Sequence, residues 1–211
     1  MTDLLDGARF PGLLLAGGGL LLVLSVGATL TVPAAIWTGP QDVSLRLIAA
    51  HSTVWRAANV GFLLATVLTA AGLFLVPPLV GDRGASLAWV AAVAFLLAAV
   101  PWLLMLAIRL AITPGVAAAF ERSGTLDPAW VPIDRLGEAL FPSFMLLAAG
   151  ALAVLGAAIV AGGSLAAPLG WACVVAGALF GGGYLFLGDM LPAFVYFPTT
   201  AVGIALLIAA R

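Results

Sequence analysis

The amino-acid sequence predicts an all-α, polytopic membrane protein, a six-helix transmembrane bundle that forms a single domain over residues 1–211. Hydrophobic residues make up 64% of the chain, charged residues make up 8%, and the mean hydropathy is +1.23. Soluble domains carry about a quarter charged residues. Uncharged stretches long enough to cross about 30 Å of hydrocarbon recur along the chain. We therefore expect a multi-pass protein of the cell membrane, and a bacterial inner membrane fits this composition.

The few charged residues exclude several classes of function. Eight arginines stand against nine acidic residues, so the chain lacks the basic surface that nucleic acid requires. Cys173 is the only cysteine and His51 the only histidine. This excludes an internal disulfide, a cysteine-rich zinc or iron–sulfur site, and bis-histidine haem ligation within one chain. We expect no nucleic-acid partner, no metal site and no cofactor.

The uncharged stretches place the helices in order. They run from Phe10 to Gln41, Ala57 to Gly81, Gly84 to Ile108, Ala139 to Gly188 and Met190 to Ala210. The fourth stretch is too long for one crossing, and a turn is predicted within it at Gly162, Gly163, Ser164 and Pro168. The six predicted helices are therefore 11–32, 54–79, 86–111, 138–161, 168–187 and 190–210. An alternative break at Gly181–Gly183 would leave a helix of about 14 residues, which is short for a crossing.

The ends and connections of these helices carry weaker signals. Asp3 and Asp6 stand where a signal peptide would carry positive charge, so we expect the first span to be retained. The connections 33–53 and 112–137 are too short to form soluble domains, and each holds a tryptophan typical of the headgroup layer. We expect both connections to lie along the membrane surface.

Small residues predict where two helices touch. In helix 138–161 they recur every fourth position at Ala149, Ala153, Ala157 and Ala161, and helix 168–187 repeats the spacing at Gly177 and Gly181. Two interpretations remain open. The two helices pack against each other within the chain, or the seam joins two copies in a homo-oligomer.

Two prolines lie within predicted helices. Pro101 falls in helix 86–111 and Pro198 in helix 190–210. Each removes a backbone hydrogen bond, so we expect a kink at both positions.

An even number of crossings sorts the charged residues by side. With six crossings, both chain ends lie on one side of the membrane. The first, third and fifth connections lie on the other side, together with most of the charged residues. The small excess of arginine on that second side favours it as the cytoplasmic one. A polar site is therefore expected to open toward the odd-numbered connections.

A stripe of polar and aromatic side chains follows one face of the second helix. At about 100° per residue, this face is shared by His51, Trp55, Asn59, Phe62, Thr66 and Thr69. An unpaired amide is costly in lipid, so Asn59 should meet a neighbouring helix or a water molecule. The stripe either holds helices together or forms one wall of a pocket.

Three charged residues at predicted helix ends have alternative interpretations. Arg109 follows Trp102 and Met105 on one helical face, and it either extends to the headgroups or pairs with a carboxylate. Glu138 is a first-turn acid that favours the helix dipole, a member of a surface cluster with Asp134 and Arg135, or part of a pocket with Phe141. Asp189 either caps the last helix or belongs to the same pocket.

Three segments resemble a known group of proteins. They read A-R-F-P-G-L-L-L, A-A-H-S-T-V-W-R-A-A-N-V-G-F-L-L and G-W-A-C-V-V-A-G. They resemble an uncharacterised family of bacterial integral membrane proteins with six or seven spans, classed only as a domain of unknown function. That resemblance implies a cell-membrane location. In size, span number and carboxylates at helix ends, the chain is also similar by analogy to small membrane-bound terpene cyclases.

Two hypotheses about function follow. In the first, the protein is an enzyme, a lyase or isomerase, that acts on an apolar, isoprenoid-type substrate entering from the bilayer. A low-dielectric pocket would favour the protonated carboxyl that serves as general acid, and aromatic faces would shelter the cation that forms. The catalytic candidates are Glu138, Asp189 and Arg109. The substrate-binding candidates are His51, Trp55, Asn59, Phe62, Thr66, Trp102, Met105, Phe141, Tyr184 and Tyr196.

In the second hypothesis the protein has no catalytic activity. It would be a lipid-binding scaffold, a small-molecule transporter or a subunit of a larger membrane complex. An apolar small molecule or a membrane lipid is the expected partner in either case. The hypotheses differ in one feature: an enzyme needs a pocket with Glu138 or Asp189 at its rim and aromatic residues below, whereas a scaffold is packed shut.

Overall fold

The fold was obtained as a computed structural model that describes the backbone of residues 2–211 and the side chains of residues 7–211. All regular structure in this range is helical, and six segments are long and apolar enough to cross a membrane. The long helices are α1 (Thr2–Thr29), α4 (Ser52–Phe74), α5 (Asp82–Ala111), α7 (Trp130–Gly162), α8 (Ala167–Leu187) and α9 (Tyr196–Ala209). The predicted all-α bundle with six spans is confirmed.

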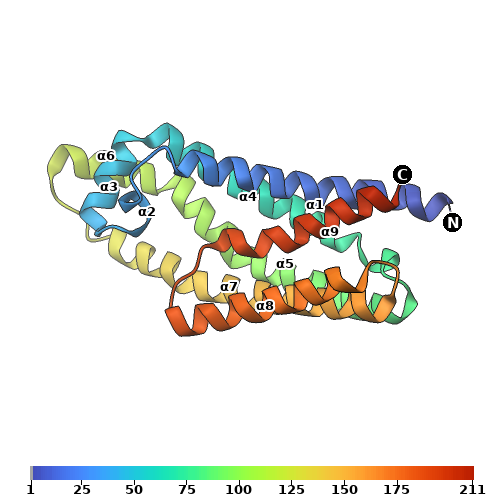
Figure 1. Cartoon of the computed structure of the whole chain (residues 1–211). Coiled ribbons are helices and arrows are strands. Elements are labelled where there is room, and N and C mark those ends of the chain that lie inside the picture. Colours follow the sequence, from blue (N-terminus) through green and yellow to red (C-terminus); the bar gives the residue numbers. More distant parts are fainter. Residues whose placement is uncertain (1) are drawn as a thin grey trace.

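The long helices lie roughly parallel in an elongated bundle, with both chain ends at the same end of the molecule (Figure 1). Helix α1 packs against α4 and α9, while α7 packs between α5 and α8. One cluster of buried apolar side chains runs through the bundle from Ala8 to Ala210. Large exposed apolar side chains are most prominent on α8, where Phe186 is 92% exposed, as expected of a surface that faces lipid.

Helix boundaries differ from the sequence prediction where proline or charge intervenes. Helix α4 ends at Phe74, and a short 3₁₀ helix η1 (Pro77–Leu79) follows, because Pro77 and Pro78 cannot continue the helical hydrogen bonding. Helix α7 begins at Trp130 rather than at residue 138. Glu138 therefore lies well inside α7, and its interpretation as a first-turn acid is wrong.

The two prolines predicted to kink helices behave differently. Helix α5 continues across Pro101. The last span begins with a second 3₁₀ helix, η2 (Pro192–Val195), and α9 starts only at Tyr196. Pro198 thus lies in the first turn of α9, where its missing N–H has no helical acceptor to lose, so the predicted kink within that helix is wrong.

The two long connections fold together into a cap at one end of the bundle. They form α2 (Ala35–Thr38), α3 (Gln41–Ala50) and α6 (Thr113–Ser123). A second buried cluster joins Ile36, Leu45 and Ile48 to Trp55 of α4 and Phe120 of α6. These short helices are stable only against one another, because a helix of about ten residues is marginal on its own.

Glycine packing closes the opposite end of the bundle. A Cβ atom at Gly84 would run into the carbonyl oxygen of Ala158, and one at Gly162 into that of Val80. Between α7 and α8, a Cβ atom on Gly177 would lie 2.6 Å from the Ala149 carbonyl oxygen and 3.0 Å from the Ala153 side chain. The predicted seam at these residues therefore packs α7 against α8 within one chain.

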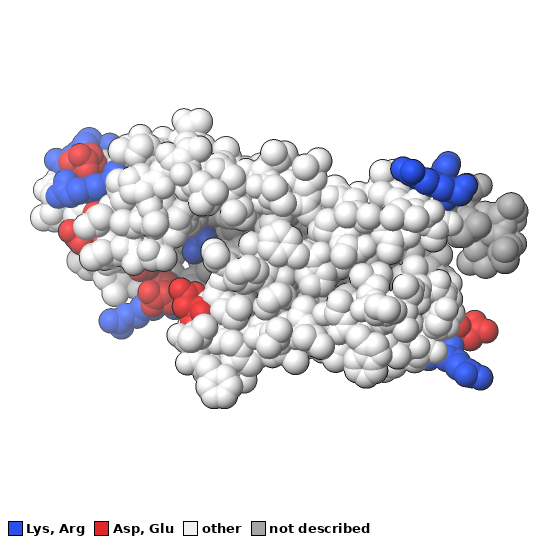
Figure 2. Space-filling model, viewed as in Figure 1, with Lys and Arg blue, Asp and Glu red and all other residues white. Residues whose placement is uncertain are grey.

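The charged side chains collect at the two ends and leave a belt without charge between them on the face shown in Figure 2. The cap end carries most of them. The predicted sorting of connections is confirmed, since the first, third and fifth connections meet there (Figure 1). At about 1.5 Å per residue, the 33 residues of α7 measure roughly 50 Å, well beyond the hydrocarbon thickness of about 30 Å.

Candidate functional site

A cavity of about 850 Å³ lies where the cap meets the bundle. Its walls come from the end of α1, the cap helices, α4, α5, the first part of α7, and the link 188–191 between α8 and η2. Figure 2 shows a hollow beside the acidic side chains at this end, with a basic side chain visible inside it. The cavity thus lies near the charged end, on the side that the sequence predicts for a polar site.

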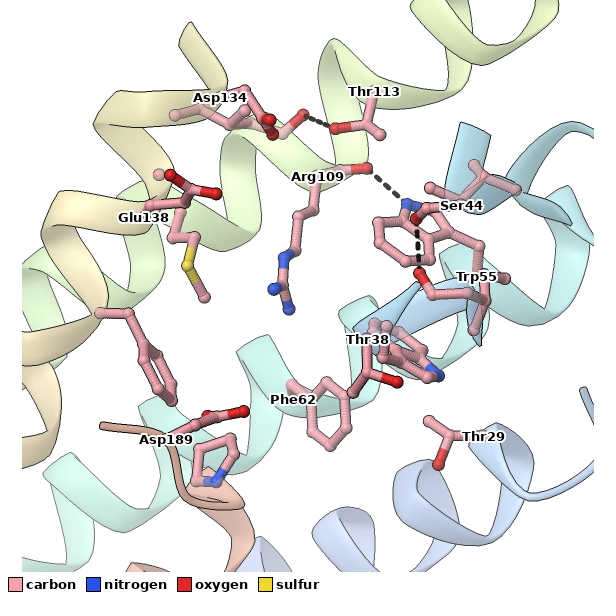
Figure 3. Close-up of a pocket in the computed structure, with 18 of the residues that line it drawn as sticks. Thr29, Thr38, Ser44, Trp55, Phe62, Arg109, Thr113, Asp134, Glu138 and Asp189 are labelled. Carbon is pink, nitrogen blue, oxygen red and sulfur yellow. Dashed lines mark hydrogen bonds between the residues drawn. The ribbon is translucent and has the colours of Figure 1, made fainter. Parts of the chain in front are cut away.

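Most of the predicted site residues line this one cavity. All three catalytic candidates, Glu138, Asp189 and Arg109, are among the lining residues. So are six of the substrate-binding candidates, namely Trp55, Phe62, Trp102, Met105, Phe141 and Tyr184. Figure 3 shows Glu138, Asp189, Phe62 and Arg109 arranged around the same open space.

Arg109 occupies the interior of the cavity, enclosed by tryptophan rings. Its guanidinium carbon lies 5.7 Å from the ring centroid of Trp37, 5.8 Å from that of Trp55 and 6.0 Å from that of Trp102. Such contacts with ring faces stabilise a cation. Among the described residues, no side chain accepts a hydrogen bond from this guanidinium, and no carboxylate lies within 4.0 Å of it. Neither predicted interpretation of Arg109, extension to the headgroups or a carboxylate pair, describes this position.

Trp55 also fixes the backbone at Arg109. The indole Nε1 of Trp55 donates a hydrogen bond of 2.8 Å to the Arg109 carbonyl oxygen (Figure 3). This carbonyl lies in the last turn of α5, where it has no helical donor. Trp55 in turn stacks on Trp37, with ring centroids 4.6 Å apart. Trp55 of α4 therefore contacts the cap through Trp37, the end of α5 through the Arg109 carbonyl, and the Arg109 guanidinium through its ring face.

Three carboxyl groups stand around the mouth of the cavity. Asp134 and Glu138 follow one another by one turn on α7, and Asp189 lies on the link between α8 and η2. Gln41 donates a hydrogen bond of 2.7 Å from Nε2 to Asp134 Oδ2, which ties α3 to α7. Glu138 and Asp189 are exposed at the rim. Asp189 is not a helix cap, because η2 and α9 have no side-chain cap.

A continuous set of aromatic rings forms the apolar wall. Phe62 lies 6.4 Å from Trp102, and Trp102 stacks on Phe144 with ring centroids 4.8 Å apart. Phe141 lies 6.1 Å from Trp102 and meets Tyr184 edge to face at 5.9 Å. This wall brings together α4, α5, α7 and α8, and it presents an apolar surface beside a charged rim.

Four predicted substrate-binding residues are not among the lining residues. His51 joins α3 to α4 and is half-buried. Asn59 is fully buried and donates to the Trp55 carbonyl of its own helix at 2.8 Å, while its Oδ1 has no partner in the described part of the chain. No neighbouring helix supplies a partner for Asn59 in this range, so that alternative of the expectation is wrong.

The remaining two, Thr66 and Tyr196, pair with each other. Their hydroxyl oxygens are 2.7 Å apart, and Thr66 donates to the Phe62 carbonyl oxygen at 2.7 Å, so the Tyr196 hydroxyl donates to Thr66. Both residues are buried below the cavity wall, with Phe95 packed against the Tyr196 ring. This pair joins α4 to α9.

Sequence reasoning missed several members of the site. The sequence predicts Trp37 for the headgroup layer and Asp134 for a surface cluster, and it gives no signal for Gln41, yet all three line the cavity. No periodic pattern connects Trp37 to Arg109, because the two meet only when the cap folds over the end of α5. Within the described residues, no group of three or more histidine, cysteine, aspartate or glutamate side chains is placed to hold a metal ion.

Comparison with known proteins found no match among protein-family models, curated proteins or solved structures. The resemblance of the three sequence segments therefore identifies no family. The protein is a polytopic membrane protein with six candidate spans in the described residues and an aromatic, charged cavity at the cap end.

Proposed function

We propose that the protein is a membrane-embedded enzyme that cyclises or isomerises an apolar, isoprenoid-type substrate in this cavity. The observation that carries the proposal is the joining of aromatic walls to Glu138 and Asp189 in one space of about 850 Å³. That volume falls within the range of small-molecule sites. A bundle that only supports other proteins has no need of such a space.

The proposed reaction begins with proton transfer from Glu138 or Asp189. The carboxyl O–H bond breaks, and the proton adds to an alkene carbon or to an epoxide oxygen of the substrate. The other end of the alkene or the opened epoxide becomes the cation. Loss of a proton from a neighbouring carbon to a carboxylate ends the reaction and restores the acid, so substrate and product are isomers. General acid catalysis of this kind contributes about 10²- to 10⁴-fold.

Arg109 limits where the substrate cation forms. Its fixed positive charge repels a second cation near Trp37, Trp55 and Trp102. Phe141 and Tyr184 line the same cavity and have no cation contact with Arg109 among the described residues, so the proposal assigns the sheltering faces to them.

A second candidate function is non-catalytic binding of a lipid or another apolar molecule, as a scaffold, a transporter or a subunit of a complex. Glu138 and Asp189 are exposed at the rim, and this observation favours the second candidate. An acid surrounded by water does not gain the protonated state that a dry pocket provides. The two candidates therefore differ in whether a proton reaches the bound molecule.

The test follows hydrogen from solvent into the bound molecule. Organic extraction of the purified protein with mass spectrometry identifies the occupant, which is then incubated with the protein in D₂O. Turnover on an alkene leaves a C–D bond, and turnover on an epoxide gives a new isomer. We expect Glu138→Gln or Asp189→Asn to abolish this turnover, with the matched variant Glu121→Gln, in the cap outside the cavity, as active as the wild type.

Each outcome of this test decides between the candidates. Full turnover in both cavity variants would rule out the acid assignment. An occupant that is retained unchanged by the wild type, with no deuterium and no isomer, would favour binding without catalysis.

A further inference from the structure

We propose that Arg109 binds one singly charged oxyanion, a carboxylate or a phosphate diester, at the polar end of the apolar molecule that fills the cavity. This inference deepens the proposed function and rests on it only in taking the occupant to be the substrate. It assigns the substrate class as an anionic amphiphile, with its head at Arg109 and its chain along the aromatic wall.

The first support is the absence of a protein acceptor for the guanidinium. Arg109 carries five N–H donors. Its side chain gives no hydrogen bond to any described residue, and the ion pair found in the described range joins Arg46 to Glu121 instead. Arg109 is half-buried, and its N–H donors face the cavity without a direct protein acceptor among the described residues. An oxyanion in the cavity supplies that acceptor.

The second support is the geometry of the tryptophan cage. Trp37, Trp55 and Trp102 lie against the guanidinium at 5.7 to 6.0 Å and restrict its position. Rings satisfy positive charge but accept few hydrogen bonds, so the N–H groups stay available for a planar or tetrahedral oxyanion. Because Trp55 also binds the Arg109 carbonyl oxygen, the backbone that carries the cation is held in place.

The third support is the charge of the surrounding wall, which limits the ligand to one negative charge. Asp134, Glu138 and Asp189 line the same cavity as the single arginine. Gln41 holds the Asp134 carboxylate on the cap side, and none of the three carboxylates comes within 4.0 Å of Arg109. With one of them protonated as the proposed acid, the other two would still repel a diphosphate, whose charge one guanidinium cannot neutralise. A single oxyanion keeps the attraction of Arg109 with the least repulsion from the rim.

The fourth support is the position of Arg109 along the bundle. It lies in the last turn of α5, next to Trp37 of the cap, and therefore at the boundary between the apolar span and the cap. An amphiphile in a bilayer keeps its head at such a boundary and its chain in the apolar layer. The aromatic wall of Phe62, Trp102 and Phe141 extends from Arg109 into the bundle and offers the chain a surface.

The test uses quenching of tryptophan fluorescence by a dibrominated fatty acid, because three of the six tryptophans surround Arg109. The protein in detergent is titrated with the acid, with its methyl ester, and with a brominated phosphatidylglycerol. We expect the acid and the phospholipid to quench at concentrations roughly ten- to hundredfold lower than the ester, since hydrogen bonds between charged groups supply that difference. Equal quenching by acid and ester would overturn the proposal.

Variants locate the effect. Arg109→Gln is expected to remove the preference for the acid, Arg109→Lys to keep part of it, and Arg83→Gln, at the far end of the bundle, to leave it unchanged. An unchanged preference in Arg109→Gln would also overturn the proposal. The comparison of acid with ester in the wild type remains decisive if Arg109→Gln does not fold.

A competition arm separates an amphiphile from a free anion. Inorganic phosphate or acetate added in the same concentration range is expected not to displace the brominated acid. Displacement by either would show a site for small free anions and would overturn the amphiphilic substrate class. Failure of the D₂O experiment with the acid preference intact would leave the Arg109 site standing, whereas equal binding of acid and ester would remove it whatever the deuterium result.

Discussion

The two ends of the bundle use apolar residues in opposite ways. Away from the cap, Gly84, Gly156 and Gly162 bring helix backbones into contact and leave no room for even a Cβ atom. Where the bundle meets the cap, Trp102 of α5, Phe141 of α7 and their neighbours surround a cavity instead. Small residues let helices approach until backbones touch, whereas rigid rings packed around a charge leave space. Whether the bundle leaves room for a ligand therefore depends on the size and shape of its apolar side chains, and not on how many of them there are.

Two glycines on α7 give the sharpest test of this comparison, and the largest expected effect. Both are buried, but a Cβ on Gly156 would run into the Gly170 carbonyl oxygen and come within 2.6 Å of Val174 N, whereas one on Gly137 would meet only Met105 at 3.8 Å. We expect Gly156→Ala to lower the free energy of unfolding by about 2–3 kcal/mol, because backbone atoms cannot yield. Gly137→Ala should leave it unchanged or raise it by up to about 1 kcal/mol.

Thermal unfolding in detergent measures both variants. Equal destabilisation by the two alanines would contradict the contrast between a closed end and an open end.

The next effect concerns Trp55, which joins the cap to the end of α5. Trp55→Phe keeps a ring next to Trp37 but removes the donor to the Arg109 carbonyl oxygen. We expect a loss of about 1–2 kcal/mol in the free energy of unfolding, as for an acceptor left without its partner. Trp89→Phe, on the exposed face of α5, is the matched control and should cost less. A Trp55→Phe variant as stable as the control would show that this hydrogen bond does not hold the cavity wall.

A smaller effect is expected inside the bundle. Tyr196→Phe removes the donor to Thr66 without changing the ring, and hydrogen bonds between membrane helices contribute about 0.6 kcal/mol on average. Tyr184→Phe serves as control, since the Tyr184 hydroxyl makes no hydrogen bond within the described range. Chemical or thermal unfolding should therefore separate the two tyrosines by a small margin. A larger loss for Tyr184 would indicate that its hydroxyl has a partner in the cavity.

The smallest effect is expected on the outer surface of the cap. Arg46 and Glu121 form an ion pair at 3.4 Å with both side chains 54% exposed, and Arg46 also covers the Phe120 ring. Exposed pairs contribute about 0.2–1 kcal/mol, and salt weakens them. Arg46→Gln should lower the unfolding temperature slightly at low salt and not at all at high salt. A loss as large as that of Gly156→Ala would mean that the cap, and not the glycine seam, limits stability.

The sequence predicted the spans because apolar length alone decides which segments cross lipid. It also predicted the seam at Gly177, where small-residue spacing follows the helix period. It failed at residues 130–137, whose proline and charges are typical of a loop although they extend α7. The helix continues there because Trp130 is buried and Gln41 pairs with Asp134 across the cap.

Only part of the cavity could be predicted, because sequence patterns report which residues share a helix face and not which segments meet in the fold. The helix period places Trp55 and Phe62 on one face of α4, and it places Trp102 and Arg109 on one face of α5. Both faces could therefore be predicted from the sequence. The cap brings Trp37 and Gln41 to the site from another segment, and no local spacing records such long-range contacts. Thr66 and Tyr196 were expected in the pocket, but their hydroxyls are used in pairing with each other.

The surplus length of α7 has a consequence for how the protein is studied in sealed vesicles. Its charged residues all lie in the first part of the helix, so the excess over the lipid thickness falls at the cap. The exposed bonds after Arg122 and Arg135 then stand clear of the bilayer on one face only. With the cap facing outward, trypsin added outside such vesicles would cut after Arg122 or Arg135, near the middle of the chain. With the opposite insertion it would reach only arginines at the other end of the bundle, such as Arg9 and Arg83. Fragment size would thus report the sidedness of each preparation.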